Sequence, residues 1–127
     1  MRTPPVPIVL VVEDHADTLD LIAEMLGRLG YQVRTAVTAA QALRSVAVDR
    51  PDAILLDVKL PDAAGVAGLE QLRRVLPAVP IIMLTANTDA AVARETLKRG
   101  AFDYITKPFD VDRVRSVLET ALATSGS

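Results

Sequence analysis

Five short apolar runs, separated by stretches with helical periodicity, constrain the fold of this chain more than any other feature of its sequence. The runs are IVLVV (8–12), QVRTA (32–36), AILLDV (53–58), IIMLT (81–85) and YIT (104–106). Most of them are apolar almost throughout rather than alternating with polar residues. Such runs are typical of strands that are buried on both faces of a parallel sheet.

After each run, apolar residues recur every three or four positions, as on one face of a helix. The helix markers are Leu19, Ile22, Leu26 and Leu29; Ala39, Leu43 and Val46; Val66, Leu69, Leu72 and Leu76; Ala90, Ala93 and Leu97; and Val111, Val114, Leu118 and Leu122. Asp17 and Asp110 are the predicted N-caps of the first and last helices, and Gly30 and Gly100 are expected to end the first and fourth. The order βαβαβαβαβα predicts an α/β fold with a parallel five-stranded sheet between helices.

Length and composition exclude several classes of protein. The 127 residues suit one domain, predicted at 8–123, with an N-terminal tail at 1–7 and a C-terminal tail or linker at 124–127. The absence of cysteine excludes disulfides and thiolate chemistry and fits a reducing cytoplasm. A net charge of −2 with 3% aromatic residues gives no support for direct nucleic-acid binding. The apolar start is too short to span a membrane. We therefore expect a cytoplasmic domain without a membrane partner.

Polar side chains stand at the ends of four of the five predicted strands. Glu13 and Asp14 follow the first strand, Asp57 lies near the end of the third, Thr85 ends the fourth and Lys107 follows the fifth. The carboxyl ends of parallel strands share one edge of the sheet, where ligands bind, so these groups should converge. Adjacent carboxylates repel each other and call for a cation. Oxygen ligands of this kind suit Mg²⁺.

A metal ion and a lysine at one site favour a phosphoryl group as the ligand, and a carboxylate can accept such a group covalently. An acidic pair at a strand end is more often a solvated loop or a helix cap, and a single Asp, Thr or Lys there carries even less information. The arrival of all these groups at four of five strand ends favours a functional site over coincidence.

The chain resembles the receiver domain of two-component response regulators over essentially its whole folded length. The resemblance rests on Glu13–Asp14 after IVLVV, Asp57 in LLDVKLPDAAG, Thr85–Ala86 in IIMLTA and Lys107–Pro108 in DYITKPF. It implies a flavodoxin-like, doubly wound (βα)5 fold with strand order 2-1-3-4-5. It also implies a phosphorylation-activated signalling switch. Such a domain is not an enzyme with an external substrate, since it catalyses only its own phosphoryl transfer and autodephosphorylation.

The resemblance implies a role for each acidic residue. Asp57 would accept a phosphoryl group from a sensor histidine kinase or a histidine phosphotransfer protein. Asp14, Asp57 and the backbone carbonyl of Lys59 would ligate Mg²⁺ (or Mn²⁺), and Glu13 would hold a metal-bound water. Lys107 would pair with the phosphoryl group.

The resemblance also implies how the switch works. Thr85 would move to hydrogen-bond the phosphoryl group, Tyr104 would rotate in concert, and the Lys107–Pro108 peptide bond would be cis. The surface formed by the fourth helix, the fifth strand and the fifth helix would then change, so that it regulates a downstream output domain or protein. The same surface allows a dimer.

Several residues near the predicted site need a separate interpretation. We hypothesise that the lifetime of the phosphorylated form is tuned by Lys59, Asn87 and Ala86. Lys59 lies two positions beyond Asp57, and Asn87 lies two positions beyond Thr85. His15 is expected to be an exposed residue at the rim, because the other candidate ligands are all oxygens. The loop departs from the family at Ala64 and Gly68, and a glycine inside a helix costs about 1 kcal/mol, so a late or loose third helix is expected.

Two other classes of function remain as alternatives. A pseudo-receiver would keep the fold as an interaction module without carrying phosphate, and the complete acidic set, Thr85 and Lys107 speak against it. A haloacid-dehalogenase-type phosphatase would need a second acid two positions after the nucleophile, where this chain has Lys59. Nucleotide binding is less supported still, since neither GxxxxGK[ST] nor GxGxxG occurs.

Overall fold

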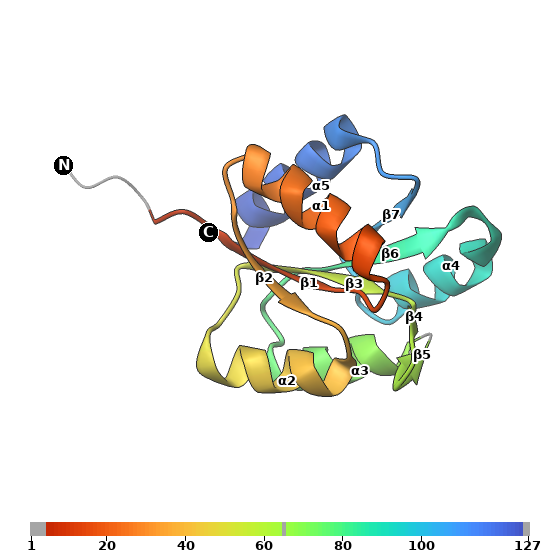
Figure 1. Cartoon of the computed structure of the whole chain (residues 1–127). Helices are drawn as coiled ribbons and strands as arrows, with labels where there is room; N and C mark the ends of the chain where they lie inside the picture. The colour runs from red at the N-terminus through yellow and green to blue at the C-terminus, as the bar shows by residue number, and fades with distance from the viewer. Residues whose placement is uncertain (1–4, 65, 126–127) are drawn as a thin grey trace.

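The computed structural model describes residues 5–64 and 66–125, which form a parallel sheet between two layers of helices (Figure 1). The sheet strands are β1 (Ile8–Val12), β2 (Gln32–Ala36), β3 (Ala53–Asp57), β6 (Ile81–Ala86) and β7 (Asp103–Lys107). The helices are α1 (Ala16–Arg28), α2 (Ala39–Val48), α3 (Ala67–Val75), α4 (Ala90–Lys98) and α5 (Val111–Ser125), and a short 3₁₀ turn, η1 (Asn87–Asp89), precedes α4. No described helix has both the length and the apolar character needed to cross a membrane.

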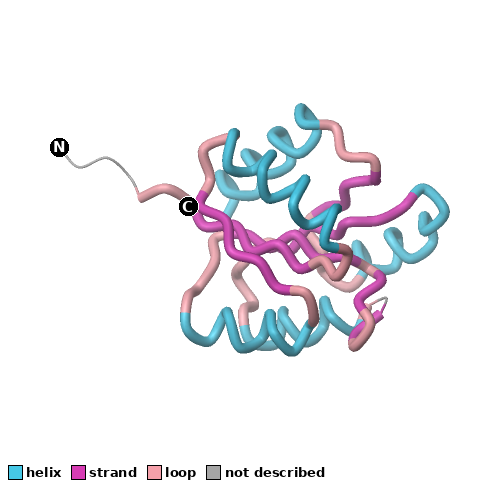
Figure 2. Tube along the Cα trace, in the orientation of Figure 1, coloured by secondary structure: helices cyan, strands magenta, loops and turns pink. Residues whose placement is uncertain are grey.

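The strand order is β2-β1-β3-β6-β7, and every neighbouring pair is parallel. Counted among the sheet strands alone, this is the predicted order 2-1-3-4-5, so the expected doubly wound α/β fold is confirmed. β1 lies between β2 and β3, so the chain crosses from one side of β1 to the other. Figure 2 shows the strands in one central layer with helices on either side of it. The crossing at β1 places the ends of β1 and β3 side by side, at the point where such sheets bind ligands.

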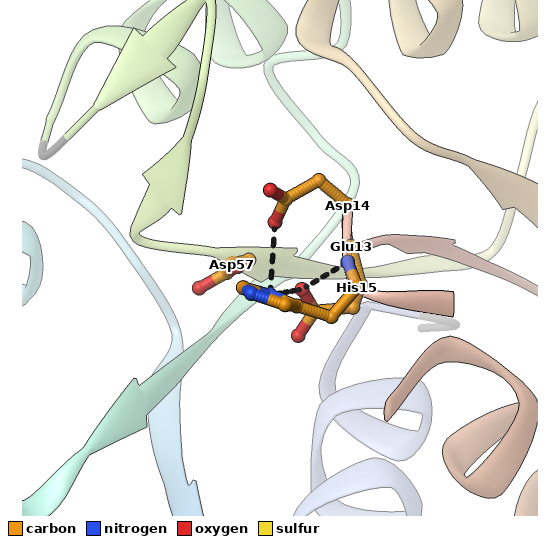
Figure 3. Close-up of side chains that lie close together, drawn as sticks. All are labelled: Glu13, Asp14, His15 and Asp57. Carbon is orange, nitrogen blue, oxygen red and sulfur yellow. Dashed lines mark hydrogen bonds and ion pairs between the residues drawn. The ribbon is translucent and has the colours of Figure 1, made fainter. Parts of the chain in front are cut away.

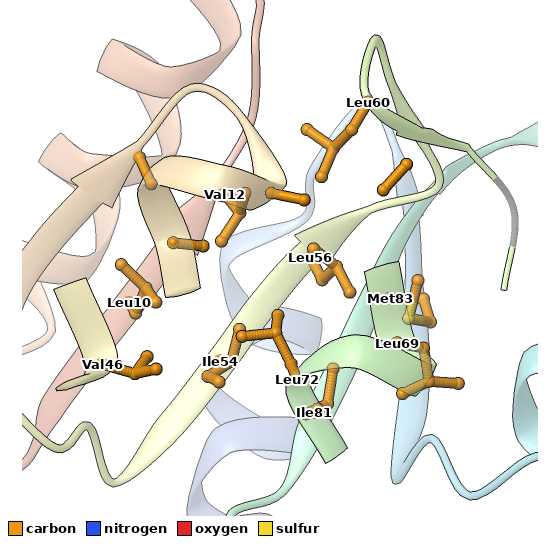
Figure 4. Close-up of a cluster of buried hydrophobic side chains, with 14 of the residues drawn as sticks. Leu10, Val12, Val46, Ile54, Leu56, Leu60, Leu69, Leu72, Ile81 and Met83 are labelled. Atoms are coloured by element: carbon orange, nitrogen blue, oxygen red, sulfur yellow. The ribbon is translucent and has the colours of Figure 1, made fainter. Parts of the chain in front are cut away.

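Two apolar clusters hold the sheet in place, one on each face. Successive strand residues point to opposite faces, so Val9 and Val11 pack toward α1 and α5, whereas Leu10 and Val12 pack toward α2 and α3. Figure 4 shows the cluster on the α2–α3 side, where Leu10, Ile54 and Met83 meet side chains from the helices. Burial on both faces explains why the strands are apolar at consecutive positions.

Helix boundaries agree with the sequence at most ends and differ at one start. Gly30 and Gly100 have positive φ angles of 97° and 105° just beyond α1 and α4, as expected of glycines that end helices. The Asp110 carboxylate accepts a hydrogen bond from the backbone N–H of Asp112, so it caps α5 as predicted. Asp17 is not the N-cap of α1, because the chain turns into the helix directly after the acidic pair. His15 holds the capping position, and Asp17 lies in the first turn.

The loop after Asp57 contains a hairpin that the sequence interpretation missed. β4 (Lys59–Leu60) and β5 (Ala63–Ala64) pair antiparallel outside the main sheet. At the hairpin tip, the Asp62 carboxylate accepts hydrogen bonds from the backbone N–H groups of Ala39 (2.9 Å) and Ala40 (3.0 Å) at the start of α2. These bonds attach the loop to the first turn of α2, where unpaired N–H groups favour an acid.

Gly68 lies inside α3, on the side that faces the hairpin and the sheet. A Cβ atom at this position would lie 3.4 Å from the carbonyl oxygen of Ala63 and 3.5 Å from Leu56 Cδ2. Both distances are ordinary van der Waals contacts, so this position does not require glycine. The helix is regular from Ala67 to Val75. At the other end of the chain, α5 continues through Ser125, two residues past the predicted domain boundary at 123.

Candidate functional site

The predicted polar residues converge at the carboxyl edge of the sheet. Glu13 and Asp14 directly follow β1, and Asp57 is the last residue of β3. Figure 3 shows the side chains of Glu13, Asp14, His15 and Asp57 lying close together. One ligand atom from each of these four residues lies within 4.8 Å of those of the others. The adjacency of β1 and β3 produces this cluster, which contains three carboxylates and one imidazole.

Lys107, which is distant from Glu13 in the sequence, supplies the cationic group of the site. It ends β7, and its Nζ lies 2.7 Å from Glu13 Oε1 and 3.6 Å from Asp57 Oδ1. The peptide bond between Lys107 and Pro108 is cis. One ammonium group thus contacts two of the carboxylates.

The acids of the site are held in very different surroundings. Glu13 is fully buried, Asp57 is 3% exposed, and the side chain of Asp14 is 28% exposed. Burial, together with the neighbouring Glu13 carboxylate, raises the pKa of Asp57 to about 6. Burial also acts to raise the pKa of Glu13, but hydrogen bonds from Lys107 and Asp57 outweigh it and lower that pKa to about 2. Asp57 is therefore the carboxylate whose negative charge is the less stable of the two.

The donor set fits a hard divalent cation. The buried oxygens Asp14 Oδ1 and Asp57 Oδ2 accept no hydrogen bond from the described part of the chain. Buried carboxylate oxygens normally have a partner, and a cation between the two strands would supply one. Carboxylate oxygens are the ligands that Mg²⁺ prefers, and the second positive charge would offset the excess of carboxylates over Lys107.

The predicted switch residues lie next to this cluster, on β6 and β7. Thr85 is buried, and its hydroxyl donates a 3.2 Å hydrogen bond to the carbonyl oxygen of Ala86. Tyr104 pairs in register with Met83 on the neighbouring strand. Its side chain is partly buried and packs against the same apolar cluster as Val92 of α4. Thr85 lies two residues along β6 from Met83, the residue that pairs with Tyr104. The aromatic ring of Tyr104, beside α4, is therefore close to Thr85 along the sheet.

Lys59 lies at the mouth of the site and reaches toward α4. Its backbone N–H donates a 3.2 Å hydrogen bond to Asp57 Oδ1, and its Nζ lies 3.4 Å from Asp89 Oδ2. The ion pair joins β4 to η1, the turn that begins at Asn87. The sequence did not predict this contact, because nothing local in the chain pairs Asp89 with Lys59.

His15 is exposed, as expected of a rim residue, but its ring lies closer to the acids than the sequence indicated. Its Nδ1 is 3.4 Å from Glu13 Oε2 and 3.4 Å from Asp14 Oδ1 (Figure 3). The signal that could have found this contact is the run of three consecutive polar residues, Glu13–His15, at the end of a buried strand.

Comparison with known proteins gives consistent matches. The sequence matches the family described as "Response regulator receiver domain" over residues 9–119. It is 43% identical over 115 residues to the transcriptional regulatory protein KdpE of Mycobacterium tuberculosis, covering 91% of this chain and 50% of that protein. It is 36% identical over 119 residues to the transcriptional regulatory protein ZraR of Escherichia coli K12, covering 94% of this chain and 27% of that protein. The chain thus spans half or less of the length of these curated relatives.

Solved structures give the same result. The receiver domain of NtrX from Brucella abortus superposes with a TM-score of 0.88 at 36% identity, covering 91% of this chain and 98% of that one. The receiver domain of the sensor histidine kinase PA1611 from Pseudomonas aeruginosa PAO1, described with a magnesium ion coordinated in its active site cleft, gives 0.84 at 35% identity. That match covers 94% of this chain and 99% of the other.

We expect Asp57→Asn to stabilise the metal-free protein at neutral pH and to lose this effect in acid. The pKa of Asp57 in the folded chain, about 6, lies above its ordinary value of 3.8. The folded state therefore holds the Asp57 proton to higher pH than the unfolded state, and the contribution of Asp57 to stability falls as the pH rises from 4 to 6. Asparagine carries no such cost, so the difference in the free energy of unfolding should grow over that interval to roughly 1–3 kcal/mol.

Urea unfolding in the presence of a chelator, at several pH values from 4 to 8, measures this difference. Asp20→Asn, at an exposed position on α1, is the matched control and should show no such trend. A stability difference for Asp57→Asn that is independent of pH would contradict the buried-charge explanation.

Proposed function

This chain belongs to the response regulator receiver domain family of two-component systems, and from this we propose that it is a switch operated by reversible phosphorylation of Asp57. The observation that carries the proposal is the placement of the Asp57 carboxylate. It is nearly completely buried, one of its oxygens lacks a hydrogen-bond partner in the described structure, and the other lies 3.6 Å from Lys107 Nζ. The raised pKa of Asp57 shows that its negative charge is poorly stabilised, and the ammonium group of Lys107 lies close enough to pair with phosphoryl oxygens added to it.

The proposed chemical step is transfer of a phosphoryl group between two proteins. An oxygen of Asp57 attacks the phosphorus atom, and the bond from phosphorus to the donor breaks, leaving its electron pair on the donor. The donor is a phosphohistidine on a sensor histidine kinase or a histidine phosphotransfer protein. Lys107 moves its ammonium group from the carboxylate to the phosphoryl oxygens, whose negative charge it stabilises. Water later hydrolyses the acyl phosphate and restores Asp57.

The metal site of the proposal uses the acids around Asp57. Asp14, Asp57 and the backbone carbonyl of Lys59 would hold Mg²⁺ (or Mn²⁺), with Glu13 binding through a water. When bound, the ion supplies positive charge that neutralises the phosphoryl oxygens. The partnerless oxygens of Asp14 and Asp57 support this assignment. Glu13 also positions Lys107, through their 2.7 Å contact.

The response to phosphorylation is proposed to pass through Thr85 and Tyr104. A phosphoryl group adds about −1.5 to −2 charges and new acceptor oxygens. The Thr85 hydroxyl, which donates to the backbone of its own neighbour Ala86, would turn to these stronger acceptors. Tyr104 would follow into the vacated space. The surface of α4, β7 and α5 would change as a result, since Tyr104 and Val92 of α4 pack against the same apolar cluster.

Residues 8–123 are proposed as the receiver domain proper, between an N-terminal tail (1–7) and a C-terminal tail or linker (124–127). Since the curated relatives are longer transcriptional regulators, the proposed partner of the α4–β7–α5 surface is an output domain or a separate output protein. Dimerisation through the same surface is part of this proposal. We assign no direct nucleic-acid contact to this chain.

Asp57→Asn should abolish covalent labelling by acetyl phosphate in the presence of Mg²⁺, because the amide cannot act as the acceptor. Intact-protein mass spectrometry would detect the added phosphoryl group on the wild-type chain and on the control Asp20→Asn. Undiminished labelling of Asp57→Asn would show that another residue is the acceptor. Absence of labelling in the wild-type chain would favour a pseudo-receiver.

Lys107→Ala should separate phosphorylation from the distal response, because the lysine links the phosphoryl oxygens to β7. We expect labelling of Asp57 to persist at a reduced rate, while the amide NMR shifts of α4 and β7 that accompany phosphorylation of the wild type are lost. Lys98→Ala, which removes an exposed lysine of α4, should retain them. Distal shifts that survive in Lys107→Ala would refute the coupling role of this residue.

Lys59 and Asn87 are proposed to tune the lifetime of the phosphorylated form, together with the small residue Ala86. The Lys59 side chain bridges from β4 to Asp89 beside the acceptor, where a hydrolytic water would approach. The double variant Lys59→Ala, Asn87→Ala should therefore lose phosphate faster than the wild type once the donor is removed. Phosphate release measured over time tests this, and a rate equal to that of the wild type and of Lys98→Ala would dispose of the proposal.

A further inference from the structure

We propose that His15 makes this acidic cluster a binding site for Zn²⁺, with the imidazole Nδ1 as a ligand beside the oxygens of Glu13, Asp14 and Asp57. The family resemblance assigns no ligand at this position. The inference comes from the placement of the ring, whose Nδ1 belongs to the group of four ligand atoms that lie within 4.8 Å of one another.

The distances around His15 fit shared coordination better than hydrogen bonding. Nδ1 lies 3.4 Å from Glu13 Oε2 and 3.4 Å from Asp14 Oδ1. N–H···O hydrogen bonds are shorter, about 2.7–3.2 Å. Two ligands bound at about 2.0–2.1 Å to one tetrahedral Zn²⁺ lie about 3.4 Å apart. Each of the two distances from the imidazole to a carboxylate is therefore that of neighbouring ligands on one such ion.

The backbone holds His15 next to the cluster while its ring stays accessible. His15 is the N-cap of α1, and its backbone N–H donates a 3.2 Å hydrogen bond to Glu13 Oε2. The side chain is 72% exposed, so an incoming ion meets the ring without displacing any packed residue.

A second observation points to a cation independently of the histidine. Asp57 is 3% exposed, and its Oδ2 has no hydrogen-bond partner among the described residues, nor has the buried Asp14 Oδ1. These two oxygens would complete the ligand set begun by Glu13 and His15. Three carboxylates and one imidazole are a donor set that zinc accepts.

The ligand preference of each metal ion determines whether His15 raises the affinity for that ion. Mg²⁺ binds oxygen and retains several waters, so it has little use for the imidazole. Zn²⁺ binds imidazole strongly. His15 should therefore raise the affinity for Zn²⁺ and leave the affinity for Mg²⁺ unchanged.

A consequence follows for phosphorylation, and it rests on the proposed function. Zn²⁺ held by His15 and the three acids would occupy the carboxylate oxygens that the proposed function gives to Mg²⁺, and would exclude that ion. Zinc would then inhibit phosphorylation rather than support it. His15 is the residue that would confer this sensitivity on the chain.

The chain offers a clean experiment, since it has one histidine and no cysteine. Zn²⁺ and Mg²⁺ are titrated separately into untagged, metal-free wild type, His15→Gln and His15→Cys, by calorimetry or chelator competition. Loss of an outer-shell partner already costs about 10–100-fold in metal affinity, so His15→Gln should bind Zn²⁺ at least about tenfold more weakly. His15→Cys supplies a thiolate and should restore zinc affinity, and all three proteins should bind Mg²⁺ equally.

NMR of the single imidazole gives a readout that does not depend on phosphorylation. Stoichiometric Zn²⁺ should shift the ring proton signals of His15, whereas Mg²⁺ should not. Equal zinc affinity in wild type and His15→Gln, or a ring that does not respond to Zn²⁺, would overturn the inference while leaving the proposed function intact. Failure of the wild type to bind either ion would overturn both.

The inhibitory consequence has its own measurement. With Mg²⁺ and acetyl phosphate present, added Zn²⁺ should suppress labelling of the wild type at concentrations that leave His15→Gln labelled. Equal suppression of the two proteins would refute a role for His15 in zinc inhibition.

Discussion

Two buried carboxylates, those of Glu13 and Asp57, share the single ammonium group of Lys107 at the carboxyl edge of the sheet. Lys107 is nearer to Glu13, whose pKa is lowered, whereas burial and the charge of Glu13 raise the pKa of Asp57. The site therefore has one acid that is stably charged and one that is not. An additional positive group at the cluster would relieve this imbalance.

The sheet can hold these like charges close together because its strands are rigid where the site lies. Apolar side chains on both faces of β1 and β3 hold these strands between two layers of helices. Figure 4 shows those on the α2–α3 face. Residues that follow directly on locked strands have little freedom to separate, so Glu13 and Asp57 remain together despite their repulsion. The polar edge thus depends on the apolar interior.

The surrounding loops are less buried, and specific polar contacts tie them to helices. Asp62 joins the hairpin after Asp57 to the first turn of α2, and Lys59 joins it to Asp89 before α4. A change of charge at Asp57 is therefore close to groups that contact two different helices. Under the proposed function, these contacts are routes by which the site communicates with the surface, in addition to Thr85 and Tyr104.

Much of this site could be predicted from the sequence, because strands, helices and the residues at strand ends are local properties of the chain. Consecutive apolar residues at 8–12 and 81–84 indicate strands buried on both faces, and parallel strands bring Asp14, Asp57 and Lys107 to one edge. The position of the α1 N-cap was wrong by two residues, since capping depends on how the chain turns out of β1.

The α/β fold and the identity of the acids at the sheet edge follow from the amino-acid sequence, and the strand order follows from the family resemblance. Three further features arise from packing: Lys107 pairs more closely with Glu13 than with Asp57, Asp62 caps α2, and the ring of His15 lies against two carboxylates. The physical reason is that periodicity and chain order are encoded locally. Distances between side chains depend on how elements far apart in the sequence pack together.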